Sequence, residues 1–135
     1  MKTLKYFSIL SLILVVVYAC SSSPIKNSSS SKEEPVVIKN DSLEYEITIL
    51  DPGFNNYLKT IARPVGFYSQ SFLETKNRIY VTIWNSRANN SLGFNPNIYG
   101  NQIDYSPHIN YGYDVNYKLF NYFEFAQRKY RIRLR

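Results

Sequence analysis

The chain has 135 residues, a formal net charge of +6 and an aromatic content of 16%, with one cysteine and one histidine. A single cysteine excludes an intramolecular disulfide framework, and His108 alone supplies too few ligands for a typical metal site. The composition therefore favours a small non-enzymatic domain that needs neither a metal nor another cofactor.

Residues 1–19 have the pattern of a bacterial lipoprotein signal peptide. Lys2 and Lys5 supply positive charge, Ile9–Tyr18 is a short apolar run, and a small residue precedes Cys20. The run is too short for a membrane-spanning helix, which needs roughly 20 residues. We therefore expect acylated Cys20 to anchor the protein in the cell envelope, at the outer membrane facing the periplasm or on the cell surface.

Residues 20–40 have the composition of a disordered tether. Seven of the eleven residues in 21–31 are serine, and Pro24 and Pro35 interrupt regular structure. Such a segment has too little apolar surface to offset the entropy cost of folding. We therefore expect one globular domain, over residues 41–135.

The positive charge is concentrated at the C-terminus. Removing Lys2 and Lys5 with the signal peptide lowers the formal charge from +6 to +4. Five cationic residues lie in the last eight positions: Arg128, Lys129, Arg131, Arg133 and Arg135. Because the body of the domain is nearly neutral and the protein is expected to be exported, we expect no nucleic-acid partner.

The first expected elements are a strand and a short helix. Residues 43–49 alternate apolar and polar side chains, as a half-buried strand does. Asp51-Pro52-Gly53 then predicts a turn. Residues 54–61 have apolar positions at helical spacing and predict a helix that ends before Pro64.

A longer helix is expected next. Ser71, with Glu74 three residues later, matches a capping box and predicts a helix that runs to about Asn89. Residues 79–84 are also rich in strand-forming side chains, so a strand there is the alternative.

Residues 89–112 are rich in Asn, Gly, Pro and Ser and predict a long loop. A helix is expected to begin at Asp114, which can serve as its N-cap. Its apolar residues form one stripe: Val115, Leu119, Tyr122, Phe123, Ala126 and Tyr130. Tyr117 and Phe120 lie off this stripe, so either a second layer covers them or they form an exposed interface.

The tail, residues 130–135, alternates apolar residues with arginine and predicts a strand. Its cationic face would suit Glu44 and Glu46 on the strand at 43–49. The sequence thus predicts an α+β fold, in which a small sheet formed by the N- and C-terminal strands of the domain packs against two or three helices.

Aromatic density is the main functional signal, with thirteen tyrosines, eight phenylalanines and one tryptophan. Tyrosines beside asparagines suit a protein-binding surface or a sugar-stacking site. The candidate protein-interaction surface consists of Tyr105, Tyr111, Tyr117 and Phe120. The candidate glycan-stacking residues are Tyr68, Trp84 and Tyr99. We expect a non-catalytic module that binds an envelope protein, with glycan or peptidoglycan binding as the alternative.

Several segments resemble an uncharacterised family of small lipoproteins from Bacteroidota. They are residues 41–47 (DSLEYEI), 51–55 (DPGFN), 66–71 (GFYSQS), 95–99 (NPNIY) and 111–117 (YGYDVNY). The resemblance covers nearly the whole expected domain. It implies a lipid-anchored envelope protein and supplies no active site.

Overall fold

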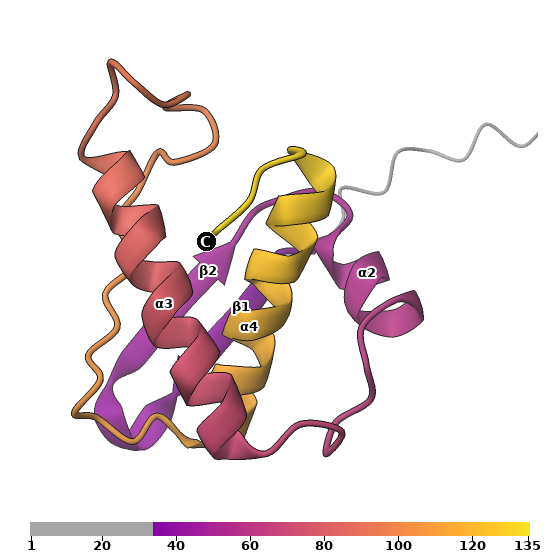
Figure 1. Ribbon diagram of the computed structural model, residues 1–135. Helices are drawn as coiled ribbons and strands as arrows, with labels where there is room; N and C mark the ends of the chain where they lie inside the picture. Colours follow the sequence, from indigo (N-terminus) through magenta and orange to yellow (C-terminus); the bar gives the residue numbers. More distant parts are fainter. Residues whose placement is uncertain (1–33) are drawn as a thin grey trace, which may run out of the picture. The chain divides into compact units, whose positions relative to one another are not determined.

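The computed structural model describes residues 34–135. The expected signal peptide, Cys20 and residues 20–33 of the expected tether lie outside the described residues. The elements are strand β1 (Val36–Asn40), a 3-10 turn (Asp41–Leu43), strand β2 (Tyr45–Ile49) and helices α2 (Phe54–Thr60), α3 (Gln70–Ala88) and α4 (Gly112–Lys129). The α+β class is confirmed: a two-stranded sheet packs with three helices (Figure 1).

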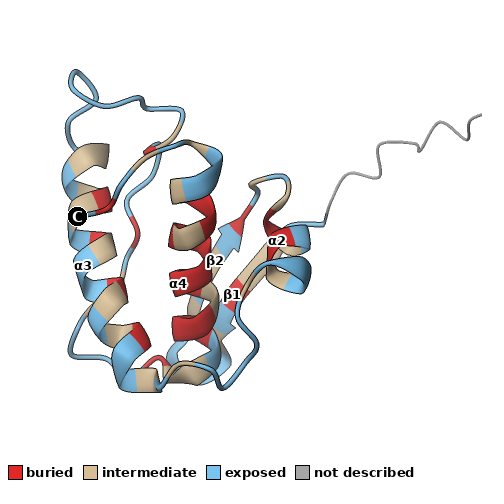
Figure 2. Cartoon of the chain, turned by 45° about the vertical axis from the view of Figure 1, so that its right-hand side comes forward, coloured by how far each residue is buried: buried red, intermediate tan, exposed pale blue. Residues whose placement is uncertain are grey.

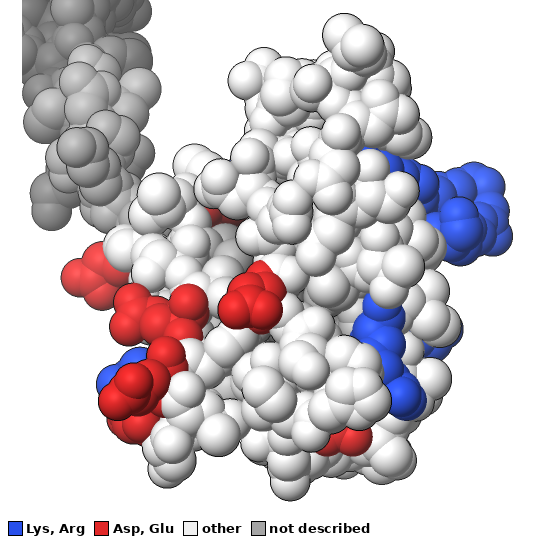
Figure 3. Space-filling model, turned by 90° about the vertical axis from the view of Figure 1, so that its left-hand side faces the viewer, with Lys and Arg blue, Asp and Glu red and all other residues white. Residues whose placement is uncertain are grey.

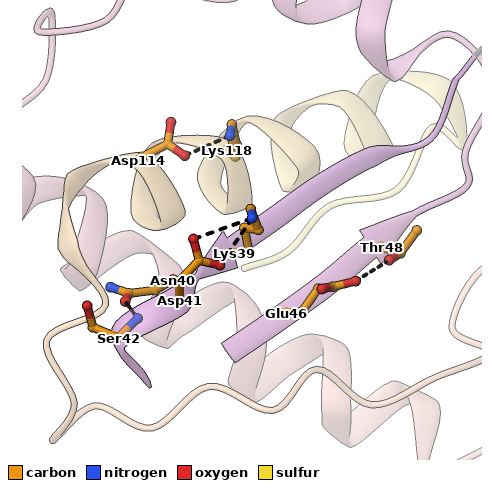
Figure 4. Close-up of polar contacts among 8 residues, drawn as sticks. All are labelled: Lys39, Asn40, Asp41, Ser42, Glu46, Thr48, Asp114 and Lys118. Atoms are coloured by element: carbon orange, nitrogen blue, oxygen red, sulfur yellow. Dashed lines mark hydrogen bonds and ion pairs between the residues drawn. The ribbon is translucent and has the colours of Figure 1, made fainter. Parts of the chain in front are cut away.

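The sheet is an antiparallel hairpin of β1 and β2, with Val36 opposite Ile49 and Asn40 opposite Tyr45. In the turn, the Asn40 side chain accepts a hydrogen bond from the Ser42 amide at 3.0 Å, and Lys39 pairs with Asp41 at 3.1 Å (Figure 4). The prediction that the C-terminal tail pairs with β2 is therefore wrong. A strand immediately upstream closes a far smaller loop than the tail would, which favours the hairpin entropically.

Strand β1 also moves the boundary of the domain. The sequence assigns residues 36–40 to the tether, yet Ile38 is fully buried in the core. Val36, Val37 and Ile38 are three β-branched residues in a row, which favour a strand where a partner is available. The folded domain thus includes part of the segment that serine content marks as a tether.

The tail takes another route. Residues 131–135 form no strand; the Leu134 amide donates to the Gln127 side chain at 3.0 Å, and Arg87 donates to the Arg133 carbonyl at 2.7 Å. Leu134 is buried in the hydrophobic core, and Tyr130 and Ile132 pack partly buried against that core, so the alternating pattern reflects core packing without a strand. The ion pairs of residues 34–135 do not include the expected arginine–glutamate pairs across the sheet.

Helix α3 is continuous through residues 79–84, so the strand alternative is wrong. Its buried face, which includes Leu73, Val81 and Trp84, packs on α4, and this packing overrides local strand propensity. The N-cap is Ser69, whose hydroxyl accepts from the Phe72 amide at 3.3 Å, and not Ser71. No helix of residues 34–135 is long and apolar enough to cross a bilayer.

Helix α4 is the centre of the domain. Ten of its residues are buried, and β1, α2 and α3 all pack against it (Figure 2). Tyr117 and Phe120 lie off the predicted stripe and pack with Leu73 of α3. Helix α3 is therefore the second layer that covers them, and they do not form an exposed interface. Asp114 is not the N-cap; it lies in the first turn and pairs with Lys118 at 2.7 Å (Figure 4).

The position of β1 predicts the effect of a substitution in the supposed tether. Ile38→Ala should lower the free energy of unfolding by about 2 to 5 kcal/mol, because it leaves a cavity in the core. Lys39→Ala, at the exposed neighbouring position, should change it by no more than about 0.5 kcal/mol. Urea unfolding of the purified protein measures both values, and equal small effects would place β1 outside the domain.

Candidate functional site

A groove of about 680 Å³ lies between strand β2 and the loop segment 97–104. Trp84 of α3 and Tyr122 of α4 also border it, and Tyr130 stands at one end. The volume is within the range of about 300 to 1,000 Å³ that ligand sites occupy.

One wall of the groove is a strand edge. Every residue from Glu44 to Asp51 borders the groove, although successive side chains of a strand point to opposite faces. This continuity indicates that the groove follows the edge of β2 rather than one of its faces. Within the described residues, β2 has a single strand neighbour, β1, on its other edge. The backbone of β2 thus presents pairing groups along the groove.

The opposite wall is held in place by α3. The Asn85 side chain accepts from the Ile103 amide at 2.8 Å and donates to the Ile103 carbonyl at 2.9 Å. The Trp84 indole donates to the Asn101 carbonyl at 3.0 Å. These bonds satisfy the backbone of the loop as a strand partner would, so the groove has two fixed walls.

The groove is acidic. Its border includes Glu44, Glu46, Asp51 and Asp104 and contains no lysine or arginine. On the face drawn in Figure 3, acidic side chains gather on one side and most basic side chains on the other.

Asp51 differs from the other three acids. Its carboxylate accepts hydrogen bonds from the Tyr122 hydroxyl at 3.2 Å, the Tyr130 hydroxyl and the Lys129 ammonium at 2.8 Å. It therefore joins the end of β2 to the end of α4 and closes one end of the groove. Glu44, Glu46 and Asp104 are exposed and take part in none of the ion pairs of residues 34–135, although Glu46 accepts a hydrogen bond from the Thr48 hydroxyl at 3.3 Å.

The expected protein-interaction residues do not form a surface. Tyr111, Tyr117 and Phe120 are buried. Tyr105 is half-buried, stacks on Tyr111 at 4.8 Å and donates to the Asn116 side chain at 2.7 Å. The hydroxyls of Tyr105, Tyr111 and Tyr117 all have hydrogen-bond partners, so these tyrosines can be buried at little cost beside Phe120.

The expected glycan-stacking residues are also mostly internal. Trp84 and Tyr99 are only 3% and 4% exposed and pack edge to face, with 4.9 Å between ring centroids. Tyr68 is half-buried and stacked on Phe72 at 4.7 Å. The three rings do not form a common platform for a sugar. Among residues 34–135, no cluster of His, Cys, Asp or Glu could hold a metal ion.

The sequence did not predict the groove along β2. Its walls come from segments about fifty positions apart, and their contact depends on the packing of α3. A partial signal existed, because Glu44 and Glu46 stood out as the acidic face of the expected strand.

Comparison with known proteins gives a family. Residues 7–135 match the family of unknown function DUF6146, and the match includes Cys20 as well as the whole described domain. The chain belongs to this family. No curated protein and no solved structure matches this chain. The DUF6146 assignment agrees with the expectation of an uncharacterised family and carries no activity with it.

The buried tyrosines of this DUF6146 member predict alkaline unfolding. Burial is the main cause that raises the pKa of seven tyrosines. Together with nearby carboxylates, it brings the pKa of Tyr80, Tyr105 and Tyr130 to about 12. Unfolded tyrosines ionise near pH 10, so the unfolded state loses protons first and stability falls as pH rises from about 10 towards 12. Phenolate absorbance and circular dichroism should change together over this range. Ionisation of these seven tyrosines near pH 10 with the fold intact would contradict the prediction.

Proposed function

We propose that the protein is a lipid-anchored, non-catalytic interaction domain of the cell envelope that binds an extended, positively charged segment of another envelope protein along strand β2. The observation that carries this proposal is the free edge of β2 inside an acidic groove. Recognition of this kind adds the ligand to the sheet as a third strand.

The geometry of the groove suits a single extended chain. The edge of β2 offers alternating backbone donors and acceptors, and the fixed wall at 97–104 stands opposite this edge. One added peptide strand would lie about 5 Å from β2. The backbone of β2 would supply affinity that does not depend on the ligand's sequence.

The side chains around the groove would supply selectivity. Glu44, Glu46 and Asp104 favour Lys or Arg on the ligand, and Ile47 and Ile98 offer apolar contacts between them. Exposed ion pairs contribute only about 0.2 to 1 kcal/mol each, so their main effect is on association rate and partner choice. The preferred ligand is therefore an extended segment in which cationic and apolar residues alternate.

Glycan binding is less well supported by this geometry. Stacking on a sugar requires open ring faces, and Trp84 and Tyr99 are buried against each other. The groove offers carboxylates and a backbone edge, which suit a polypeptide.

The lipid anchor and the location at the outer membrane facing the periplasm are part of the proposal. They rest on the apolar run before Cys20, on the short length of that run and on the resemblance to small Bacteroidota lipoproteins. The DUF6146 match from residue 7 onward includes this region.

Peptide binding tests the groove directly. A fluorescent peptide of alternating apolar and arginine residues should bind the purified protein, and its glutamate counterpart should not. Replacing Glu44 and Glu46 by glutamine should weaken binding by about 2-fold to 30-fold, the loss expected for two exposed ion pairs. Asp114→Asn, which removes an exposed acid on α4, is the matched control and should leave binding unchanged.

The backbone contribution needs a separate measurement. Methylating alternate amide nitrogens of the peptide on its pairing edge removes donors and should abolish binding, whereas methylating the opposite set should be tolerated. Equal tolerance of both patterns would rule out strand addition, and binding insensitive to the glutamate variants would place the ligand elsewhere.

Acylation of Cys20 can be tested by metabolic labelling with a clickable fatty acid. The wild-type protein should carry the label, and Cys20→Ala should lose it and accumulate as the uncleaved precursor. Ser21→Ala, one position later, should be labelled and processed normally. Normal processing and release of the Cys20→Ala protein would show that the segment is an ordinary secretory signal.

A further inference from the structure

A second surface of the domain is unusually apolar. The connection between α2 and α3, together with the first turn of α3, exposes Ile61, Val65, Phe67 and Phe72, which we name the loop patch. Val65 is 71% exposed and Phe67 is 56% exposed. Tyr68 joins the two exposed rings, with its ring centroid 4.8 Å from that of Phe67 and 4.7 Å from that of Phe72, and contiguous exposed apolar surface of this kind marks a contact site.

The loop patch has a fixed shape. Tyr117 of α4 donates its hydroxyl proton to the Arg63 carbonyl at 2.6 Å. The Tyr113 hydroxyl accepts from the Gly66 amide at 2.8 Å and donates to the Tyr68 carbonyl at 3.0 Å. Two tyrosines of the central helix therefore hold the loop at three points. These hydrogen bonds fix the backbone that carries the exposed side chains of the loop patch.

Cations accompany the exposed rings. The Arg63 guanidinium lies 5.1 Å from the centre of the Phe67 ring, and the Lys76 ammonium lies 5.8 Å from that of Phe72. The charged residues within 61–76 are Arg63, Glu74 and Lys76, and the half-buried Glu74 accepts a hydrogen bond from the Gln70 side chain at 2.7 Å. The nearby Glu124 of α4 accepts the Tyr80 hydroxyl at 2.9 Å and shares a small hollow with Arg63 and Arg128. The patch thus combines apolar side chains with a surplus of positive charge.

We propose that the loop patch docks on the membrane that holds the lipid anchor, with Val65 and Phe67 among the lipid headgroups and with Arg63 and Lys76 beside anionic phosphates. This inference rests on the acylation of Cys20 proposed above. Aromatic and cationic side chains are the types that settle at the boundary between headgroups and acyl chains.

Because the lipid anchor keeps the domain near the bilayer, the loop patch needs only a low affinity of its own to dock there. Covalent geometry alone limits the reach from Cys20 to Glu34 to at most about 50 Å, so the domain stays close to the bilayer. At the resulting effective concentration, a patch of a few side chains needs little affinity of its own. The single carboxylate within residues 61–76, Glu74, is half-buried and bonded to Gln70, so cations outnumber acids in this segment and an anionic membrane would attract it.

Tryptophan placed in the patch tests this orientation. The acylated full-length protein, carrying Phe67→Trp, is reconstituted in vesicles of phosphatidylethanolamine and phosphatidylglycerol whose acyl chains are brominated near the headgroup. Leu92→Trp is the matched control, because Leu92 is fully exposed in the loop at the other end of α3, about 28 Å away along that helix (Figure 1). Buried Trp84 gives the same background in both proteins.

We expect the emission of the Phe67→Trp protein to shift to shorter wavelength and to be quenched at least twofold more than that of the Leu92→Trp protein. Adding Arg63→Glu with Lys76→Glu should abolish the difference, whereas adding Lys39→Glu on β1 should preserve it. If the Phe67→Trp protein stays on the vesicles and its introduced indole is not quenched, the docking proposal alone is overturned. A blue shift without quenching indicates a protein contact and overturns it as well. Protein that leaves the vesicles would instead overturn the anchor.

Discussion

The arrangement of the domain depends on how the apolar surface of helix α4 is buried by its neighbours. This helix buries ten residues, and no single neighbour covers them; β1, α2 and α3 each take one side. Because β1 makes the main strand contact with α4, β2 is left at the outer side of the hairpin. Because α3 lies along another side, its Trp84 and Asn85 are placed to hold the loop at 101–103. The groove between β2 and that loop is thus a consequence of how one helix is buried.

The helices could be predicted from the sequence, whereas the pairing of the strands could not. Apolar residues at helical spacing located α2 and α4 closely, and α3 remained ambiguous only at 79–84, where tertiary contacts decide. Serine content hid β1, since Val36–Ile38 is a short apolar run next to a polar segment. The alternating tail had a strand's pattern, but its apolar residues pack in the hydrophobic core without pairing with another strand. Alternation shows which side chains are buried and does not identify the covering partner.

Tyrosine density misled the prediction of the site for a physical reason. A phenol is large and apolar with one polar atom, so it can cover a core and also satisfy a loop backbone. The hydroxyls of Tyr111, Tyr113 and Tyr117 form hydrogen bonds with backbone atoms of three loop residues: Ser106, Gly66 and Arg63. Amino-acid composition cannot distinguish tyrosines that hydrogen-bond to loops inside the domain from tyrosines that form a binding surface. The acidic groove, by contrast, joins residues that are remote in sequence, and only the three-dimensional packing brings them together.

The short length of β2 has a kinetic consequence. Five residues of edge span only about 17 Å, and Asp51 with its tyrosine and lysine partners closes one end. A ligand added there would form few backbone hydrogen bonds, each with a modest net contribution, so it would dissociate quickly. If the proposed acylation of Cys20 holds the domain at a membrane, and if its partner is held at the same surface, the two would meet again soon after they separate. A domain of this design would hold its partner by frequent rebinding, and the partner could be exchanged without unfolding either protein.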